Sequence, residues 1–286
     1  MNPRITVVTV THNSEHVLRE FFKSIDLASS AEDDVAVVVV DSGSTDDRET
    51  KQIAEEMGAT FIAASGNVGY GTASNLGASS ARSDYVVFVN PDVAIGAQSL
   101  LEMASRAAKL GIACIGPLLR SSDGTDQHTF RSAIRPLWSR RPAQTSPSGG
   151  PDDVVEVETV SGCCMVVNRD AFQEVGGFDE SFFMFCEETD LHTRLRAAKR
   201  KVAVDLAHVA VSEGGASSAG VSRRWSVTER SIAHVQYTRK HFSFAATAID
   251  WTWRLAQILF GGEYKPRGKS FAQFVQGTLG ANPYGR

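Results

Sequence analysis

The chain has 286 residues, of which 42% are hydrophobic and 22% charged, a composition typical of globular proteins. This composition excludes a disordered, collagen-like or coiled-coil chain. Its 29 Lys and Arg against 33 Asp and Glu give a formal net charge of −4, which excludes the basic balance of a nucleic-acid-binding protein. Residues 222–286 nevertheless carry ten Lys and Arg against three Asp and Glu, so a basic tail follows an acidic body.

The cysteines and the hydrophobic runs predict a cytoplasmic protein. Cys163 and Cys164 are adjacent, which disfavours a disulfide between them, and no CxxC spacing indicates a zinc site. The apolar run at the start of the chain is too short for a signal peptide, so we interpret it as a strand. The best candidate for a membrane span, residues 242–260, contains Asp250 and Arg254. We therefore expect neither secretion by that route nor a membrane-spanning helix.

The first hundred residues alternate short β-branched runs with longer helical patterns, which is the rhythm of βαβ units. Residues 35–40 are apolar throughout, as in a parallel strand that helices cover on both faces. This pattern predicts a doubly wound α/β arrangement. In chain order the predicted strands are 5–10, 35–40, 60–63 and 85–89, and the predicted helices are 15–27, 47–57 and 72–81.

The pattern is less regular beyond residue 111. Residues 132–153 are rich in Pro, Ser, Gly and Arg, which predicts a mobile surface loop. Residues 226–260 have a helical pattern, and the Gly and Pro that follow Gly261 indicate a loose tail. In this part the predicted strands are 113–115, 154–160, 163–168 and 202–205, and the predicted helix is 188–198.

Polar side chains directly follow the predicted strands of the first half. They occupy residues 9–14, 41–46, 66–71 and 90–92. Ligands of open α/β sheets bind at the carboxyl ends of the strands. We therefore expect these four segments to meet in one crevice.

Two carboxylates in these segments are candidates for ligand binding. Asp92, in the turn Asn90-Pro91-Asp92, can hold Mg²⁺ or Mn²⁺, whose coordination substrate phosphates and water usually complete. The alternative is an ordinary turn, because these residue types are common in turns. Asp41 ends a buried strand, so its carboxylate needs a partner, which a base or ribose would provide. Helix capping alone explains residues 44–46.

A glycine-rich turn and an acidic segment are further candidates. Gly69 lies just before a predicted helix, where glycine permits a close backbone approach and the helix N-terminus favours anions. Glu187, Glu188 and Asp190 directly follow an aromatic run. The helix dipole stabilises acids in a first turn, which is a sufficient structural explanation. An apolar wall would, however, raise the pKa of a carboxylate and suit it to accept a proton.

Taken in order, these segments resemble the inverting family 2 glycosyltransferases, which have the GT-A fold. The resemblance extends over residues 4–220 and implies a Rossmann-like α/β nucleotide-diphospho-sugar transferase fold. Such a fold has a mostly parallel central sheet flanked by helices, here followed by a C-terminal helical extension. The runs Asn-Pro-Asp-Val and Gly-Gly-Phe-Asp-Glu most resemble rhamnosyltransferases that act on lipid-linked acceptors in cell-wall assembly. The matching segments are residues 8–14, 40–46, 67–77, 90–92, 161–165 and 176–191.

The resemblance implies three parts and a role for each matching residue. Residues 1–112 would bind the nucleotide sugar, residues 113–221 would bind the acceptor and carry the catalytic base, and residues 222–286 would form a basic amphipathic helical extension. Glu188 matches the general base, with Glu187 beside it, and Asp92 matches the ligand of a divalent metal cofactor, Mg²⁺ or Mn²⁺. The positions implied to bind the nucleotide and the donor sugar are Thr9, Thr11, Asp41, Asn67, Gly69, Asn75, Asn90 and Gly162.

One position departs from the family pattern. Members usually carry a histidine, often a further metal ligand, shortly before a Gly-x-Ser segment, and this chain has Ser212 there. Either metal binding is weaker than in the family, or His208 or Glu213 substitutes for the histidine.

The expected activity is inverting transfer of a sugar from a nucleotide-diphosphate donor to a hydroxyl of a lipid-linked or glycan acceptor. The resemblance favours L-rhamnose from dTDP-rhamnose and an acceptor like polyprenyl-diphosphate-GlcNAc. UDP-galactofuranose or UDP-GlcNAc as the donor, and a non-catalytic scaffold that binds sugar nucleotides, remain alternatives. A dinucleotide-dependent dehydrogenase is disfavoured, because no G-x-G-x-x-G follows the first predicted strand.

The basic tail has apolar residues at roughly helical spacing: Phe242, Ala245, Ile249, Trp253 and Phe260. Such a segment is suited to peripheral contact with the anionic inner face of the plasma membrane. Packing on its own domain, or on a second subunit in a homodimer, is the alternative. The positive charge of this segment comes from Arg223, Arg224, Arg230, Arg239, Lys240 and Arg254.

Overall fold

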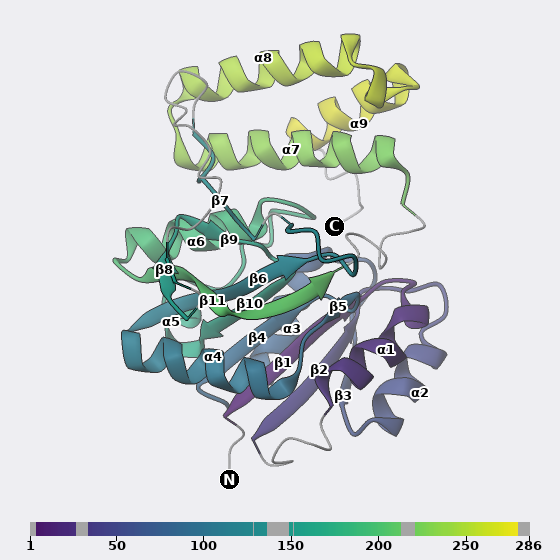
Figure 1. Cartoon of the computed structure of the whole chain (residues 1–286). Helices are drawn as coiled ribbons and strands as arrows, with labels where there is room; N and C mark the ends of the chain where they lie inside the picture. Colours follow the sequence, from purple (N-terminus) through teal and green to yellow (C-terminus); the bar gives the residue numbers. More distant parts are fainter. Residues whose placement is uncertain are drawn as a thin grey trace.

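A nine-stranded mixed sheet forms the centre of the molecule (Figure 1). The computed structural model describes residues 4–26, 34–127, 129–135, 149–150, 152–212 and 221–279. The strand order is β3-β2-β1-β4-β10-β6-β11-β5, and β8 pairs with β11 beside this path. The strands are β1 (Ile5–Thr11), β2 (Val35–Asp41), β3 (Thr60–Ala63), β4 (Tyr85–Val89), β5 (Val93–Ala94), β6 (Ile112–Arg120), β8 (Val154–Glu156), β10 (Cys164–Asn168) and β11 (Lys201–Ser212).

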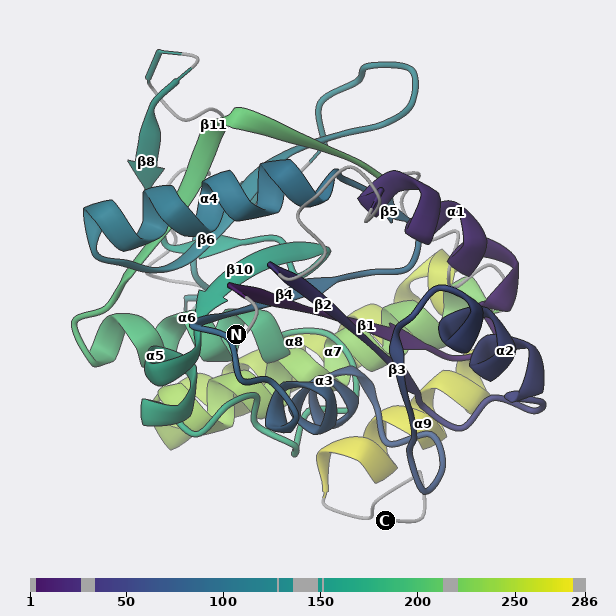
Figure 2. The ribbon, with the colours of Figure 1, turned by 90° about the horizontal axis from the view of Figure 1, so that it is seen from below.

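Helices cover both faces of this sheet, which confirms the predicted α/β fold (Figures 1 and 2). One apolar core lies between the sheet and the helices α1 (Glu15–Ile25), α2 (Arg48–Glu56) and α4 (Ala97–Leu110). A second core lies on the opposite face, under α3 (Tyr70–Ser79), α5 (Arg169–Glu174) and α6 (Glu187–Ala197). Because both faces are covered, the central strands are apolar at nearly every position.

The four strands β3, β2, β1 and β4 are parallel, and their bounds match the prediction to within one residue. β10 then runs antiparallel to both β4 and β6, so the sheet is only partly parallel. This reversal brings the segment before β10 next to the carboxyl end of β4. Residues of the second half of the chain thereby lie beside the strand ends of the first half.

The chain after β4 differs from the prediction in several places. The predicted strand 154–160 is divided between β8 and β9 (Thr159–Val160), and β9 pairs with β7 (Phe130–Arg131) in a separate sheet. The division follows from the pairing partners, because residues 154–156 pair with β11 whereas Thr159 and Val160 pair with β7. Between them, the Glu158 carboxylate accepts from the backbone N–H of Ala133 at 2.8 Å. β11 extends seven residues beyond the predicted strand 202–205, and α4 and α5 were not predicted. Of the predicted mobile loop 132–153, residues 136–148 and 151 lie outside the described residues.

The C-terminal extension is a layer of helices rather than one helix and a tail. It consists of α7 (Arg223–His241), α8 (Phe244–Phe260), a short 3-10 helix (Gly262–Tyr264) and α9 (Arg267–Thr278). The predicted helix 226–260 breaks before Ser243, whose hydroxyl accepts from the backbone N–H of Ala246 and caps α8. The predicted loose tail is wrong for the described residues, because α9 buries Phe274 in an apolar cluster shared with α7 and α8.

This extension is fastened to the body through α7. Ala233 and Tyr237 of α7 pack with Phe182 and Cys186, which lie just before α6. In Figure 1, α7 lies over α6, and α8 lies farther from the sheet. Within the described part of the chain, no helix combines the length and hydropathy needed to cross a bilayer.

The contact between α3 and the parallel strands yields a stability prediction. A Cβ at Gly77 would lie 2.4 Å from Val8 Cγ1 and 3.0 Å from Val40 Cγ2, both on buried strands. We expect Gly77→Ala to lower the free energy of unfolding by about 1–3 kcal/mol in urea titrations, because the tightly packed core must move. Gly268→Ala is the matched control. Gly268 lies in another helix, α9, and a Cβ on it would have no atom within 4 Å. Equal stability of the two variants would contradict this packing.

Candidate active site

The carboxyl ends of β1 and β2 meet at Asp41, as the sequence predicts. The Asp41 carboxylate is buried and accepts from Thr11 Oγ1 at 3.2 Å, from Ser44 Oγ at 2.6 Å and from the Ser44 backbone N–H at 2.8 Å. The chain therefore already provides the partners that a buried carboxylate requires. Contact of Asp41 with a base or ribose stays a prediction.

His12 joins three of the converging segments and was not among the predicted binding residues. Its Nδ1 lies 2.9 Å from the carbonyl oxygen of Ser42, so this nitrogen donates. In the neutral ring Nε2 then accepts from Asn67 Nδ2 at 3.3 Å. His12 thus connects the ends of β1 and β2 with the turn before α3, where Asn67 was predicted. Its position among the polar residues after the first strand was the available sequence signal.

Two glycines permit this convergence. Gly43 has φ of 71°, and a Cβ on it would lie 2.4 Å from the backbone nitrogen of Asn67. Gly69 has φ of 83° and immediately precedes α3. A larger residue at either position would be strained, because L-residues rarely adopt positive φ. Gly43 therefore lets the two turns approach each other, and Gly69 lets the backbone turn into α3.

Thr9 and Asn75, which we expected to contact the donor, are respectively buried in a strand and hydrogen-bonded to the protein. Thr9 is fully buried within β1, opposite Val39 of β2, and its hydroxyl has no hydrogen-bond partner in the described structure. The Asn75 side chain on α3 donates to the Phe178 carbonyl and accepts from the Phe178 N–H, each at 2.9 Å. Asn75 therefore fastens the segment before α6 to α3. Its role in donor binding stays a prediction, as does that of Thr9.

The loop before β10 brings the two halves of the site together. The backbone N–H of Asn90 donates to the carbonyl of Cys163 at 2.9 Å, which ties the turn of Asp92 to this loop. One residue earlier, a Cβ built on Gly162 would lie 3.4 Å from Glu188 Cβ. The predicted metal ligand and the predicted base therefore flank adjacent residues of one loop.

Tyr70, at the start of α3, binds the same loop from a third side. Its hydroxyl donates to the Gly162 carbonyl at 3.2 Å, and its backbone N–H donates to the Phe183 carbonyl at 3.0 Å. Burial raises the pKa of the Tyr70 hydroxyl, and the nearby Glu187 adds to this effect. Tyr70 therefore stays neutral and serves as a hydrogen-bond donor that holds Gly162 near Glu188.

The backbone that leads into α6 is strained. Phe185 and Cys186 have φ of 70° and 64°, values that non-glycine residues adopt only at an energetic cost. The Arg230 guanidinium of α7 lies over the Phe185 ring, 4.7 Å from its centroid. Consecutive residues of this kind are over-represented at functional sites. Here they orient the first turn of α6, which bears the acids.

The acids of this turn have different environments. Glu187 is buried, and burial, followed by the adjacent Glu188, raises its pKa well above the ordinary value. Glu188 is half-buried and lies against Gly162. Asp190 is fully buried and accepts from Arg194 Nε at 2.7 Å, Lys240 Nζ at 2.8 Å and His241 Nε2 at 2.7 Å. Glu188 is therefore the acid of this turn that is open to a substrate.

Ser212 and His208, the described residues near the position of the missing histidine, lie in different surroundings. Ser212 lies opposite Val93 in the pairing of β11 with β5. Val93 is the residue that follows Asp92. His208 instead contacts Glu102 and Asp205, each at 3.1 Å, on the side of the sheet covered by α4. His208 therefore does not take the place of the missing histidine, and Glu213 lies outside the described residues.

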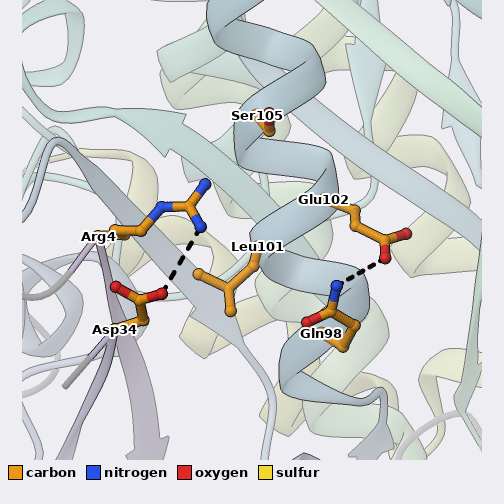
Figure 3. A pocket seen from close by; sticks show the side chains of 6 residues that line it. All are labelled: Arg4, Asp34, Gln98, Leu101, Glu102 and Ser105. Atoms are coloured by element: carbon orange, nitrogen blue, oxygen red, sulfur yellow. Dashed lines mark hydrogen bonds and ion pairs between the residues drawn. The ribbon is translucent and has the colours of Figure 1, made fainter. Parts of the chain in front are cut away.

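A small pocket elsewhere does not belong to this site (Figure 3). Its volume is about 280 Å³, and it lies where β1 and β2 begin, at the end of the strands opposite to Asp41 and Asp92. The pocket contains the ion pair of Arg4 with Asp34 at 3.6 Å. Its lining residues are Arg4, Asp34, Gln98, Leu101, Glu102 and Ser105.

The buried Glu187 leads to a prediction about pH. The pKa of Glu187 in the folded protein lies above the ordinary 4.5, so Glu187 keeps a proton that the unfolded chain releases. The free energy of unfolding therefore falls as pH rises above 4.5. We expect Glu187→Gln to raise the melting temperature at neutral pH, with a gain that disappears below pH 4.5. Thermal unfolding across this pH range is the measurement. Glu49→Gln, an exposed acid in the first turn of α2, is the control. A pH-independent effect of Glu187→Gln would contradict the assignment.

Similarity to known proteins agrees with this geometry. The model of glycosyl transferase family 2 matches residues 6–176. N-acetylglucosaminyl-diphospho-decaprenol L-rhamnosyltransferase of Mycobacterium tuberculosis is 35% identical over 69% of this chain and 72% of its own length. Rhamnosyltransferase WbbL of Escherichia coli is 23% identical over 68% of this chain and 77% of its own length.

Solved structures of glycosyltransferases share the fold. One is the mannosyltransferase PcManGT of Pyrobaculum calidifontis in complex with GDP-Man and Mn²⁺. The match covers 98% of this chain and 87% of the mannosyltransferase chain, with a TM-score of 0.62 and 15% sequence identity. Another is GalNAc-T7 with UDP, GalNAc and Mn²⁺. This match covers 98% of this chain and 56% of the GalNAc-T7 chain, with a TM-score of 0.68 and 13% sequence identity. The fold is therefore GT-A, and the chain belongs to glycosyl transferase family 2.

Proposed function

We propose that this protein transfers L-rhamnose from dTDP-rhamnose to a hydroxyl of an acceptor like polyprenyl-diphosphate-GlcNAc, with inversion at the anomeric carbon. The name of the mycobacterial relative, with its 35% identity to this chain, supports both the sugar and the acceptor. The observation that carries the proposal is the loop of Gly162 and Cys163. It contacts Glu188 on one side and the turn of Asp92 on the other.

Glu188 is the proposed base. It would accept the proton of the acceptor hydroxyl while the oxygen attacks the anomeric carbon from the face opposite the leaving diphosphate. Holding the two substrates at this angle supplies much of the rate enhancement. Glu187 stays protonated beside it, because a second buried negative charge there is unfavourable. Glu187 is therefore the neutral neighbour of the proposed base.

Asp92 is the proposed ligand of a divalent metal, Mg²⁺ or Mn²⁺. Among the described residues no three His, Cys, Asp or Glu side chains lie close enough to hold an ion by themselves. One carboxylate fits these metals, because they keep water and substrate phosphates as their other ligands. When bound, such an ion offsets the charge that develops on the leaving diphosphate. Asn90 and Asp92 would orient that diphosphate at the carboxyl end of β4.

The base assignment predicts a separation of binding from transfer. Glu188→Gln keeps the shape of the side chain but removes the proton acceptor, so we expect transfer to fall by about 10²- to 10⁴-fold. The rise in melting temperature on adding dTDP-rhamnose should persist, because donor binding does not require the base. Glu174→Gln, which changes an exposed acid at the end of α5, should leave transfer unchanged. A fully active Glu188→Gln enzyme would remove the assignment.

The metal assignment predicts that Asp92→Ala weakens metal-dependent donor binding by at least about tenfold. The matched control is Asp84→Ala, an exposed aspartate that directly precedes β4, at its opposite end. The measurement is a thermal-shift titration of dTDP-rhamnose, UDP-galactofuranose and UDP-GlcNAc with Mg²⁺, with Mn²⁺ and with chelator. A larger shift with a UDP sugar would replace the proposed donor. A shift that neither chelator nor Asp92→Ala reduces would contradict the metal role.

A further inference from the structure

The outward side of α8 is uncharged along its whole length. Its large exposed side chains are Phe244, Ile249, Trp253, Leu259 and Phe260, and its other exposed residues are alanine or threonine. Phe244 and Phe260 are 88% and 80% exposed, and Trp253 is 50% exposed. Contiguous exposed apolar surface of this kind marks a contact with a partner or a membrane.

Ala245, Ile249, Trp253 and Phe260 recur at helical spacing and form one stripe, which we call the outer face of α8. Phe242, which the sequence pattern grouped with them, instead packs beside Phe182 and Tyr237 on the inner side. The residues of this face are exposed, and Figure 1 shows α7 between α8 and the sheet.

The charged groups of α8 point inward. Asp250 is buried and contacts His234 at 2.9 Å and Arg254 at 3.3 Å. Lys240, on α7, is likewise engaged with Asp179 at 2.6 Å and Asp190 at 2.8 Å. Arg254 and Lys240 are two of the cations for which the sequence left membrane contact and packing on the protein open, and both contact acids of the protein.

A different set of cations lies in the segment that follows α8. Lys265, Arg267 and Lys269 come after the short 3-10 helix and are exposed. Arg267 Nη2 lies 3.5 Å from the carbonyl oxygen of Phe260, which places this cation at the end of the face. The exposed acid of this segment, Glu263, lies 4.0 Å from Arg223. The outer face therefore ends in net positive charge.

We infer that the outer face of α8 inserts into the interface of an anionic lipid bilayer. Trp and Phe are suited to the boundary between headgroups and acyl chains, and the bordering cations Lys265, Arg267 and Lys269 complement anionic headgroups. A second copy of this chain is a poorer occupant. A two-fold contact through this face would bring three cations from each copy to it, and the one exposed acid of the same segment, Glu263, already lies 4.0 Å from Arg223.

The choice of a lipid surface rests on the proposed function, because a polyprenyl-linked acceptor is itself held in a membrane. Docking through α8 would set the bilayer on the side of α7 that is remote from the sheet, with α6 beneath α7 (Figure 1). The start of α6 carries Glu188. The helical layer would therefore lie between the bilayer and the base.

The test is co-sedimentation of the full chain with vesicles of phosphatidylglycerol or of phosphatidylcholine, without donor or acceptor. We expect binding to phosphatidylglycerol vesicles, reduced at least about tenfold by Trp253→Gln with Phe260→Gln, since two aromatic side chains leave the interface. Met57→Gln with Leu110→Gln, which changes two exposed apolar residues of the body, should bind like the wild type. Lys265→Gln with Lys269→Gln should lose the preference for the anionic lipid.

Equal vesicle binding by the Trp253→Gln, Phe260→Gln variant and the wild type would overturn the inference. So would absence of wild-type binding to phosphatidylglycerol, or a dimer in analytical ultracentrifugation that this variant dissociates. The donor-induced thermal shift of each variant checks its folding and separates the two proposals. Loss of vesicle binding with an intact shift counts against the membrane face alone, and vesicle binding without any donor shift counts against the proposed function alone.

Discussion

A buried carboxylate that must remain paired organises the part of this molecule that carries the candidate base. Asp190 is fully buried in α6, and leaving its charge unpaired there would be strongly unfavourable. Arg194 of the same helix provides one partner, and Lys240 and His241 of α7 provide the others. This requirement fixes α7 against α6. The first turn of α6, which holds the candidate base, therefore depends on a helix beyond residues 6–176, the part that the family model matches.

The segment before α6 is held from the other side by α3. Asn75 binds the backbone of Phe178 through both atoms of its amide, and Tyr70 binds Phe183 and Gly162. These bonds offset the strain of the left-handed backbone at residues 185 and 186. Glu188 is thus positioned by contacts from α3, α7 and the loop of Gly162. No single element of the fold sets its place.

The parallel half of the fold could be predicted from the sequence because its signals are local. Strands such as β2 are continuously apolar, and glycine-rich or polar turns separate them from amphipathic helices. The division of residues 154–160 between two sheets could not be predicted, because it depends on strand partners, β11 and β7, that are distant in sequence. The helix α9 was missed because Pro266 and Gly268 indicate a loop, whereas burial of Phe274 decides the outcome.

For the candidate site too, features set by local sequence could be predicted, and contacts between distant residues could not. The order of the polar segments after the strands predicted which residues would converge, and the hydrogen bonds of Asp41 and His12 demonstrate that convergence. The sequence could not indicate that Gly162 and Cys163 connect Glu188 with the turn of Asp92, since that requires β10 to reverse direction beside β4. The hydrogen bonds that satisfy Asn75 were equally inaccessible, because they link residues 103 positions apart.

If one loop holds the proposed base and the proposed phosphate-binding turn in position for direct displacement, transfer must invert the anomeric carbon. The decisive experiment is to incubate the wild-type protein with dTDP-rhamnose and a polyprenyl-diphosphate-GlcNAc acceptor. Mass spectrometry and NMR of the product then give its mass and anomeric configuration. We expect one added rhamnose per acceptor, with the configuration inverted relative to the donor. Retention of configuration, or hydrolysis of bound donor without transfer to any acceptor, would rule out direct displacement.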